Sequence, residues 1–225
     1  MNSRVPSTDA PLRRHALVTL TAAGWAALFA RNAALAGDAH VRAWAERGWP
    51  LVVRRALPDE TGVPLGMPLP PSAGKRRVAV CVAADALAAV AAPPAFADVL
   101  DAAPAAWRPA LRALDALGAR CGVPGRVFGS LAWQALTGER YLSGTSDLDV
   151  LFPLPDAAQA ATLLDGLAVL DAAAPMRIDG ELLRADGAGV NWRELHAGLP
   201  EVAIKTTGGV ALGAAAEFMA GGGSR

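Results

Sequence analysis

Apolar residues recur along this chain at two spacings, which predict helices and strands in comparable numbers. Residues 105–120 carry large apolar side chains at three- and four-residue intervals, the spacing of an amphipathic helix. Short unbroken apolar runs bounded by turn residues, such as VAVCVA at 78–83, are typical of buried strands. We therefore expect an α+β fold, with a small strand-rich domain followed by a mixed sheet packed with helices.

The spacing divides the chain into two predicted domains and a tail. The N-terminal domain, residues 1–92, is expected to hold helices at 16–30, 38–47 and 84–92 and strands at 51–56 and 78–83. Pro93 and Pro94 then break the pattern. The second domain, residues 104–210, is expected to alternate helices at 105–120, 130–138 and 156–169 with strands at 126–128, 147–152, 175–179 and 201–206. Residues 216–225 are expected to be a disordered tail.

Charge is balanced overall but divided unevenly between the two ends of the chain. The formal net charge is zero, yet residues 1–80 carry 11 lysines and arginines against 5 acidic residues. This basic half could face an acidic partner or a polyanionic ligand, or be ordinary surface charge. No basic run with interleaved aromatic residues occurs, so a nucleic-acid partner is not expected.

The two cysteines, Cys81 and Cys121, lie in no metal-ligand spacing, which favours a reduced cytoplasmic protein. Arg13 and Arg14 precede the apolar stretch 16–30, so a signal peptide is the alternative interpretation of this region. The stretch is interrupted at Arg31 and is too short to span a bilayer as a stable helix. We therefore expect no membrane association.

Residues 126–152, RVFGSLAWQALTGERYLSGTSDLDVLF, carry the clearest chemical signal. Asp147 and Asp149 are two apart on a predicted strand, so they share a face, where like charges call for a divalent cation. Mg²⁺, with Mn²⁺ as the alternative, is typically held by one or two carboxylates plus substrate phosphates. Gly129 and Ser130 open a predicted helix, whose free N–H groups would favour a phosphate. The purely structural alternatives are that the two aspartates cap the next helix and that Ser130 is a helix N-cap.

The order of these elements resembles the nucleotidyltransferase core of the DNA polymerase β-like superfamily over roughly residues 105–206. Its signature is Gly-Ser or Gly-Gly after an apolar residue, then Asp-x-Asp, then a third carboxylate on a later strand. Here Gly129 precedes Asp147 by 18 residues, a longer spacer than usual, which a loop at 138–146 would explain.

A fuller set of segments resembles one family in particular. WAERGWPLVVRRA, VPLGMPLPP, FGSLAWQALTG, YLSGTSDLDVLF, RIDGELL, NWREL and VAIKT are similar, in this order, to the phosphoribosyl-dephospho-CoA transferases that serve malonate decarboxylase as holo-[acyl-carrier-protein] synthases. The resemblance covers about residues 12–207. It implies transfer from 2′-(5″-triphosphoribosyl)-3′-dephospho-CoA to a serine of the apo acyl-carrier subunit, with release of pyrophosphate.

The resemblance also implies roles for individual residues. Asp147 and Asp149 would be metal ligands and Gly129 and Ser130 would hold the β- and γ-phosphates. Asp179 is the preferred third carboxylate, as ligand or base, with Glu181 the second choice and a turn at Asp179-Gly180 the bland alternative. Lys205 would contact the triphosphate or the carboxylates, or else be a solvated edge lysine. Arg193 would contact the triphosphate, or else form a salt bridge with a neighbour such as Glu194 or Glu201.

Two other functions remain open at this point. A nucleotidyltransferase using an NTP on another protein or small molecule would need the same catalytic core. A non-catalytic module that binds a carrier protein would not need two clustered carboxylates. Metal-dependent release of pyrophosphate separates these alternatives, and the N-terminal segments favour the prosthetic-group transferase.

Overall fold

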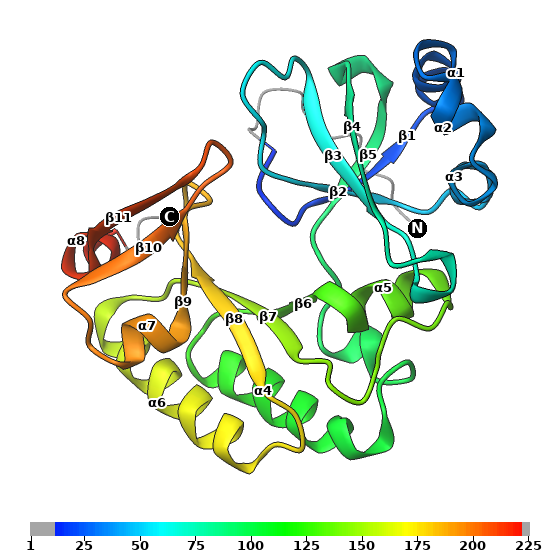
Figure 1. The fold of residues 1–225 in the computed structure, drawn as a ribbon. Helices are drawn as coiled ribbons and strands as arrows, with labels where there is room; N and C mark the ends of the chain where they lie inside the picture. Colours follow the sequence, from blue (N-terminus) through cyan, green and yellow to red (C-terminus); the bar gives the residue numbers. More distant parts are fainter. Residues whose placement is uncertain (1–11, 222–225) are drawn as a thin grey trace. The chain divides into compact units, whose positions relative to one another are not determined.

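A computed structural model describes residues 12–221 of the chain (Figure 1). The chain divides into two compact units, Met1–Ala92 and Pro93–Arg225, and each is described by itself. Two consecutive prolines open the second unit. Proline fixes φ and lacks a backbone donor, so Pro93 and Pro94 extend neither a helix nor a sheet ladder across this point.

The first unit is built on a five-stranded sheet with only antiparallel pairings, in the order β4-β3-β2-β1-β5. Its strands are β1 (Leu17–Leu20), β2 (Leu51–Val53), β3 (Val63–Pro68), β4 (Arg77–Val82) and β5 (Leu87–Ala91). Its helices are α1 (Ala22–Arg31), α2 (Ala33–Gly37), α3 (Ala39–Glu46) and the 3-10 turns η1 (Pro71–Ala73) and η2 (Ala84–Ala86). The fully buried Trp44 of α3 donates its indole N–H to the Pro50 carbonyl at 3.2 Å.

Two predicted helices of this unit are wrong in whole or in part. Residues 84–92 form the turn η2 and then strand β5, which pairs with β1, because sheet pairing overrides the helix preference of alanine. Residues 16–30 begin with β1 and become helical only at Ala22. Thr21 ends the strand and caps α1, since its hydroxyl oxygen accepts from the Gly24 N–H at 2.9 Å.

Arg54 and Glu60 brace the loop that follows β2. The Arg54 guanidinium donates to both Glu60 carboxylate oxygens, at 2.8 and 2.5 Å, and Nε donates to the Leu65 carbonyl at 3.1 Å. The hydrogen bond from Arg54, with a second from the Leu57 N–H, lowers the pKa of Glu60 to about 2. Arg54 is therefore held within its own unit by Glu60 and backbone carbonyls.

This pair predicts a pH-dependent part of the stability. A carboxyl group whose pKa is lower in the folded than in the unfolded chain stabilises the fold above its unfolded pKa. We expect the melting temperature of the protein to exceed that of Glu60→Gln most clearly above about pH 4.5, the ordinary glutamate range. The difference should shrink as the pH falls toward 2. Thermal unfolding from pH 7 to pH 3 checks this, and a difference independent of pH would contradict it.

The second unit is built on a six-stranded mixed sheet, in the order β11-β10-β9-β8-β7-β6. Only β7 and β8 run parallel; the other pairings are antiparallel. The strands are β6 (Arg126–Phe128), β7 (Leu148–Pro153), β8 (Ile178–Leu183), β9 (Gly189–Asn191), β10 (Glu201–Lys205) and β11 (Val210–Ala214). The helices are η3 (Ala97–Val99), η4 (Ala105–Trp107), α4 (Arg108–Arg120), α5 (Gly129–Thr137), α6 (Ala157–Ala173), α7 (Trp192–His196) and α8 (Ala215–Ala220).

Helix α6 makes the parallel pairing possible. Parallel strands need a long crossover, and α6 supplies the connection from the end of β7 to the start of β8. Helices α4 and α6 lie beside one another against the sheet (Figure 1). Their leucines belong to the hydrophobic core of this unit. The predicted α+β class, with two sheets, is confirmed.

The end of the chain differs in part from its prediction. Within the predicted disordered segment 216–225, residues up to Ala220 belong to helix α8, and residues 222–225 lie outside the described part. Phe218 anchors α8, because its side chain is fully buried in the core of the second unit. The spacing of apolar residues also did not predict β9, β11 and α7, each of which has five residues or fewer.

Candidate active site

The pairing of β7 with β8 brings the central carboxylates together. Asp149 is the second residue of β7, and its register partner on β8 is Asp179. Paired residues of neighbouring strands point to the same face, so the two half-buried carboxylates lie side by side. Asp147 immediately precedes β7 and lies two residues before Asp149. Three carboxylates therefore gather at the start of two parallel strands.

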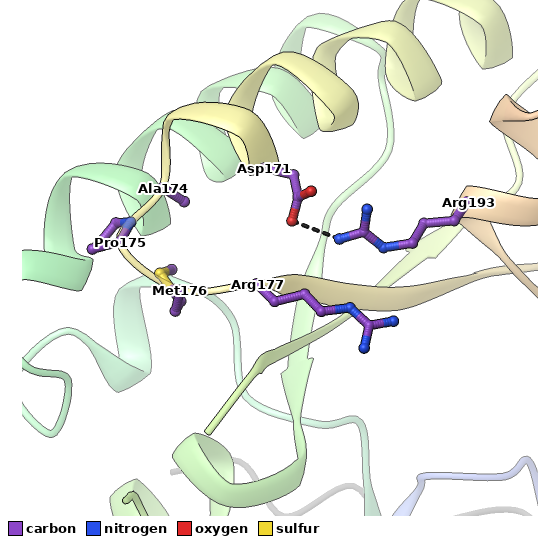
Figure 2. Close-up of a pocket in the computed structure, with 6 residues that line it drawn as sticks. All are labelled: Asp171, Ala174, Pro175, Met176, Arg177 and Arg193. Atoms are coloured by element: carbon purple, nitrogen blue, oxygen red, sulfur yellow. Dashed lines mark hydrogen bonds and ion pairs between the residues drawn. The ribbon is translucent and has the colours of Figure 1, made fainter. Parts of the chain in front are cut away.

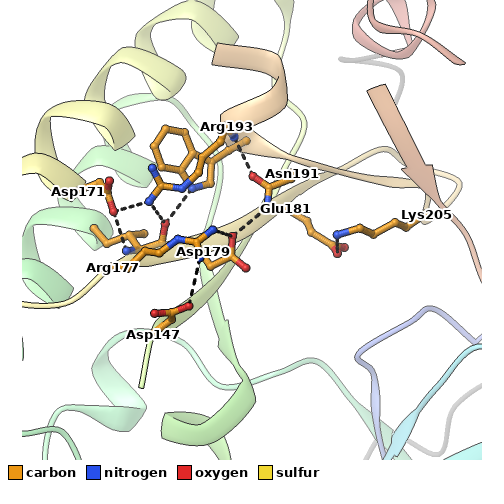
Figure 3. Close-up of polar contacts among 10 residues, drawn as sticks. Asp147, Asp171, Arg177, Asp179, Glu181, Asn191, Arg193 and Lys205 are labelled. Carbon is orange, nitrogen blue, oxygen red and sulfur yellow. Dashed lines mark hydrogen bonds and ion pairs between the residues drawn. The ribbon is translucent and has the colours of Figure 1, made fainter. Parts of the chain in front are cut away.

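Two polar side chains contact Asp179 directly (Figure 3). The Asn191 amide, at the end of β9, donates to Asp179 Oδ1 at 2.8 Å. The guanidinium of Arg177, just before β8, lies between two carboxylates, 3.7 Å from Asp147 Oδ2 and 3.7 Å from Asp179 Oδ1. Asp179 thus has an oriented carboxylate, because one of its oxygens is fixed by an amide.

Gly129 is required by the position of Asp149. Its φ is +64°, and a Cβ added there would lie 1.8 Å from Asp149 Oδ2. Asp149 itself pairs in register with Phe128 of β6, the residue before Gly129. The carboxylate therefore rests against the backbone at the start of α5, in space that only glycine leaves open.

Ser130 is the second residue of α5, so it is not the N-cap of that helix. The N-cap is Phe128, and no side chain caps the helix by a hydrogen bond. The first N–H groups of a helix have no intrahelical acceptor and carry partial positive charge. The chemistry of this helix start is suited to an anion held next to Asp149.

Lys205 and Glu181 form an ion pair on the same sheet. Lys205 Nζ, on β10, lies 2.9 Å from Glu181 Oε1, and Glu181 is only 6% exposed. Glu181 lies two residues after Asp179 on β8 and so shares its face. Asp179 and Glu181 are both inside a strand, so the turn proposed for Asp179-Gly180 does not form.

Removing the lysine should destabilise the second unit. Breaking a buried ion pair leaves a charge without its partner, and Lys205 is itself partly exposed, so we expect Lys205→Met to lower the free energy of unfolding by about 2 kcal/mol. The double variant Lys205→Met/Glu181→Leu should recover most of this loss, because it removes both charges. Urea unfolding followed by circular dichroism measures both variants. A double variant no more stable than Lys205→Met would contradict the explanation.

Arg193 forms hydrogen bonds with residues of α6 and of strand β8. Its guanidinium donates to Asp171 Oδ1 at 2.6 Å and to the Ile178 carbonyl at 3.1 Å, and it stacks 4.5 Å over the Trp192 ring. Burial alone would raise the pKa of Asp171, but hydrogen bonds from Arg193 and the Ile178 N–H lower it below its ordinary value. Arg193 thus forms a salt bridge, as its alternative interpretation had it, but with Asp171 and not with Glu194 or Glu201.

A pocket of about 590 Å³ opens beside this pair (Figure 2). It is lined by Asp171, Ala174, Pro175, Met176, Arg177 and Arg193. Arg177 therefore borders both the pocket and the carboxylates of β7 and β8.

Comparison with known sequences agrees with this architecture. The sequence model of the phosphoribosyl-dephospho-CoA transferase MdcG C-terminal domain matches residues 87–216, and that of the MdcG N-terminal domain matches residues 13–93. The chain belongs to the phosphoribosyl-dephospho-CoA transferase family. The resemblance inferred from the sequence segments is thus confirmed, over both units.

Individual relatives of the family match over nearly the whole chain. A protein of Bradyrhizobium diazoefficiens named phosphoribosyl-dephospho-CoA transferase is 46% identical over 98% of both chains. A protein of the same name from Xanthomonas campestris pv. campestris is 39% identical over 88% of this chain and 92% of its own. No solved structure matches this chain.

The family's implied metal can be tested against the side chains. Among residues 12–221, no group of three or more histidines, cysteines or acidic residues is arranged to hold a metal ion. Two carboxylates with substrate phosphates are, however, a sufficient donor set for Mg²⁺. Asp147 and Asp149 supply such a pair, and one of them, Asp147, already has a cationic group, the Arg177 guanidinium, at 3.7 Å. The donor set therefore fits a metal completed by substrate oxygens.

The structure separates the predicted site residues into two groups. Asp147, Asp149 and Asp179 gather at the start of β7 and β8, with Asp149 against Gly129. Lys205 and Arg193 are instead each bound to another carboxylate of the protein. Sequence reasoning missed Arg177 and Asn191. Arg177 had a signal, since it opens the segment RIDGELL from which Asp179 and Glu181 were chosen.

No helix in the described part of the chain is long and apolar enough to cross a membrane. In the first unit, Arg13 is exposed and Arg14 Nη2 lies 3.1 Å from the His15 ring nitrogen Nε2. These residues open the family-like region.

Proposed function

We propose that this protein transfers the phosphoribosyl-dephospho-CoA group from 2′-(5″-triphosphoribosyl)-3′-dephospho-CoA to a serine of the apo acyl-carrier subunit of malonate decarboxylase, releasing pyrophosphate. Membership of the transferase family supports the group transferred. The single observation that carries the catalytic part is the cluster of Asp147, Asp149 and Asp179 against the Gly129 backbone. Such a cluster does not stabilise the fold, because like charges on a shared face repel one another.

The proposed reaction forms one bond to phosphorus and breaks another. The serine Oγ of the carrier attacks the α-phosphorus of the donor, the bond from that phosphorus to the bridging oxygen breaks, and pyrophosphate leaves with that oxygen. The serine proton goes to Asp179, whose carboxylate is oriented by the Asn191 amide at 2.8 Å. The prosthetic group stays joined to the carrier through a phosphodiester.

The remaining residues bind and position. Asp147 and Asp149 would hold Mg²⁺ or Mn²⁺, which when bound supplies positive charge for the phosphate oxygens and the leaving pyrophosphate. The N–H groups at Gly129 and Ser130 would hold the terminal phosphates, since the start of α5 has no side-chain cap. We assign Lys205 and Arg193 supporting roles, because each neutralises a carboxylate next to the site, Glu181 and Asp171.

The first unit is proposed to recognise the donor and the carrier. Its end of the chain is basic, with 11 lysines and arginines against 5 acidic residues over residues 1–80. Such a surface suits an acidic carrier subunit or the phosphates of the donor. Arg13 is a candidate contact, because its side chain is exposed. A cytoplasmic location belongs to the same proposal, and both cysteines are unpaired, as a reducing compartment requires.

Intact-mass spectrometry of the carrier subunit tests the reaction. Apo carrier is incubated with the full-length protein, the triphosphoribosyl donor and Mg²⁺, and in parallel with ATP in place of the donor. A mass gain equal to the donor minus pyrophosphate, dependent on Mg²⁺, supports the proposal. A gain of a nucleotide monophosphate with ATP alone would indicate a nucleotidyltransferase of other specificity. No modification with either substrate would leave a carrier-binding module.

A further inference from the structure

Arg177 is held far more loosely than Arg193, the other arginine beside the carboxylates. Its two ion pairs, to Asp147 and Asp179, are both 3.7 Å long, outside hydrogen-bonding distance, and its side chain is 56% exposed. Arg193, by contrast, donates to Asp171 at 2.6 Å and is 33% exposed. The guanidinium of Arg177 thus lies between two carboxylates without being fixed by either.

Charge makes this position unusual. Asp147, Asp149 and Asp179 bring three negative charges to the start of β7 and β8, and Arg177 brings one positive charge between two of them. A divalent cation carries twice that charge in a smaller volume, so it would displace a loosely held guanidinium from between carboxylates. Arg177 and a metal ion held by Asp147 and Asp149 would therefore compete for Asp147.

The pocket gives the displaced side chain a destination. Arg177 also lines the 590 Å³ pocket, where the other charged side chains are Asp171 and Arg193, already paired with each other (Figure 2). With that pair neutral, Arg177 contributes the net positive charge of the pocket lining. An arginine there can bind phosphate oxygens with two parallel N–H groups.

We propose that Arg177 is a stand-in cation of the free protein, which leaves Asp147 and Asp179 when a divalent metal binds and then holds the polyphosphate end of the donor at the pocket. This inference rests on the proposed function for the identity of the polyphosphate. The first half of it, competition between Arg177 and a metal, concerns the protein without any substrate. The two halves predict opposite effects of the same substitution.

The metal half is measured without donor. Mn²⁺ binding to the full-length protein is followed by electron paramagnetic resonance for the unmodified protein, Arg177→Met, Arg177→Lys and Arg112→Met. Arg177→Met should bind Mn²⁺ about fivefold more tightly, because two weak ion pairs no longer oppose the metal. Arg177→Lys should stay near the unmodified protein. Arg112 is exposed on α4, so Arg112→Met is the matched loss of one charge and should change nothing.

The second half of the proposal, the phosphate contact, is tested by measuring the binding of inorganic pyrophosphate at saturating Mg²⁺ with titration calorimetry. Arg177→Met should bind pyrophosphate about tenfold more weakly than the unmodified protein or Arg112→Met. A side chain that merely supports the fold would not tighten one ligand and weaken the other. Mn²⁺ binding that is equal, weaker or undetectable in Arg177→Met overturns the competition, and unchanged or absent pyrophosphate binding overturns the phosphate contact.

The outcome is separable from that of the proposed reaction. Arg177→Met could bind Mn²⁺ more tightly and pyrophosphate more weakly while the carrier gains no mass from the triphosphoribosyl donor. In that case the proposed reaction is wrong, and the role of Arg177 as a stand-in cation is supported. If the carrier is modified but Arg177→Met gives neither shift, the reaction stands and this inference fails.

Discussion

Asp149→Asn is expected to lower the rate of carrier modification roughly thousandfold, which corresponds to about 4 kcal/mol of transition-state stabilisation. Asp149 pairs in register with Asp179 and rests against Gly129, so it joins the carboxylates to the start of α5. Asparagine has nearly the same shape but is a neutral, weaker ligand for a hard cation. The fold should therefore survive while the metal-binding pair is lost. Initial rates from intact-mass spectrometry of the carrier give the comparison.

The matched control for this variant is Asp165→Asn. Asp165 is exposed on α6, and its carboxylate lies 3.5 Å from Nε2 of the His196 ring. Removing its charge should leave the rate within about twofold, because exposed pairs of this kind contribute little. An Asp149→Asn protein that folds normally and keeps more than a tenth of the activity would rule out Asp149 as an essential ligand.

The predictable part of this molecule is the part that local spacing determines. The period-two placement of Asp147 and Asp149 was sufficient to put both at the start of one strand, because side-chain alternation is a property of the strand alone. The loop between α5 and β7 was likewise foreseen from the 18-residue spacer after Gly129. Gln134 holds that loop, since its side-chain oxygen accepts from the Tyr141 and Leu142 N–H groups at 3.1 and 3.2 Å.

The unpredictable part depends on which strands pair and in which register. Nothing in the segment around Asp179 says that this residue lies opposite Asp149. A shift of β8 by two residues in one direction would put Glu181 opposite Asp149, and a shift by two in the other would put Arg177 there. Tertiary contacts likewise decide the partners of Lys205 and Arg193, which are Glu181 on β8 and Asp171 on α6. The sequence left open whether Lys205 would meet the donor or a carboxylate. The helix predicted for the Ala-rich segment 84–92 was wrong for a related reason. Alanine is compatible with either structure, and the edge of β1 selected the strand.

Gly129→Ala is expected to lower the transfer rate at least a hundredfold while changing the stability only modestly. Alanine at a φ of +64° costs about 1–2 kcal/mol in backbone strain. The new Cβ would also lie 1.8 Å from Asp149 Oδ2 and 2.6 Å from Asp149 Cγ, so the carboxylate must move. A displacement of about 1 Å in a catalytic group is enough to cost roughly a hundredfold in rate. Carrier modification and thermal unfolding are measured on the same protein samples.

Gly138→Ala supplies the control, because it carries the strain without the clash. Gly138 ends the same helix, α5, at a φ of +73°, and a Cβ there would meet nothing within 4 Å. Both variants should therefore lose about 1 kcal/mol of stability from the backbone. Only Gly129→Ala should lose activity and the ability to bind Mn²⁺. Equal activities in the two variants would mean that the contact between Gly129 and Asp149 has no part in positioning the carboxylate for catalysis.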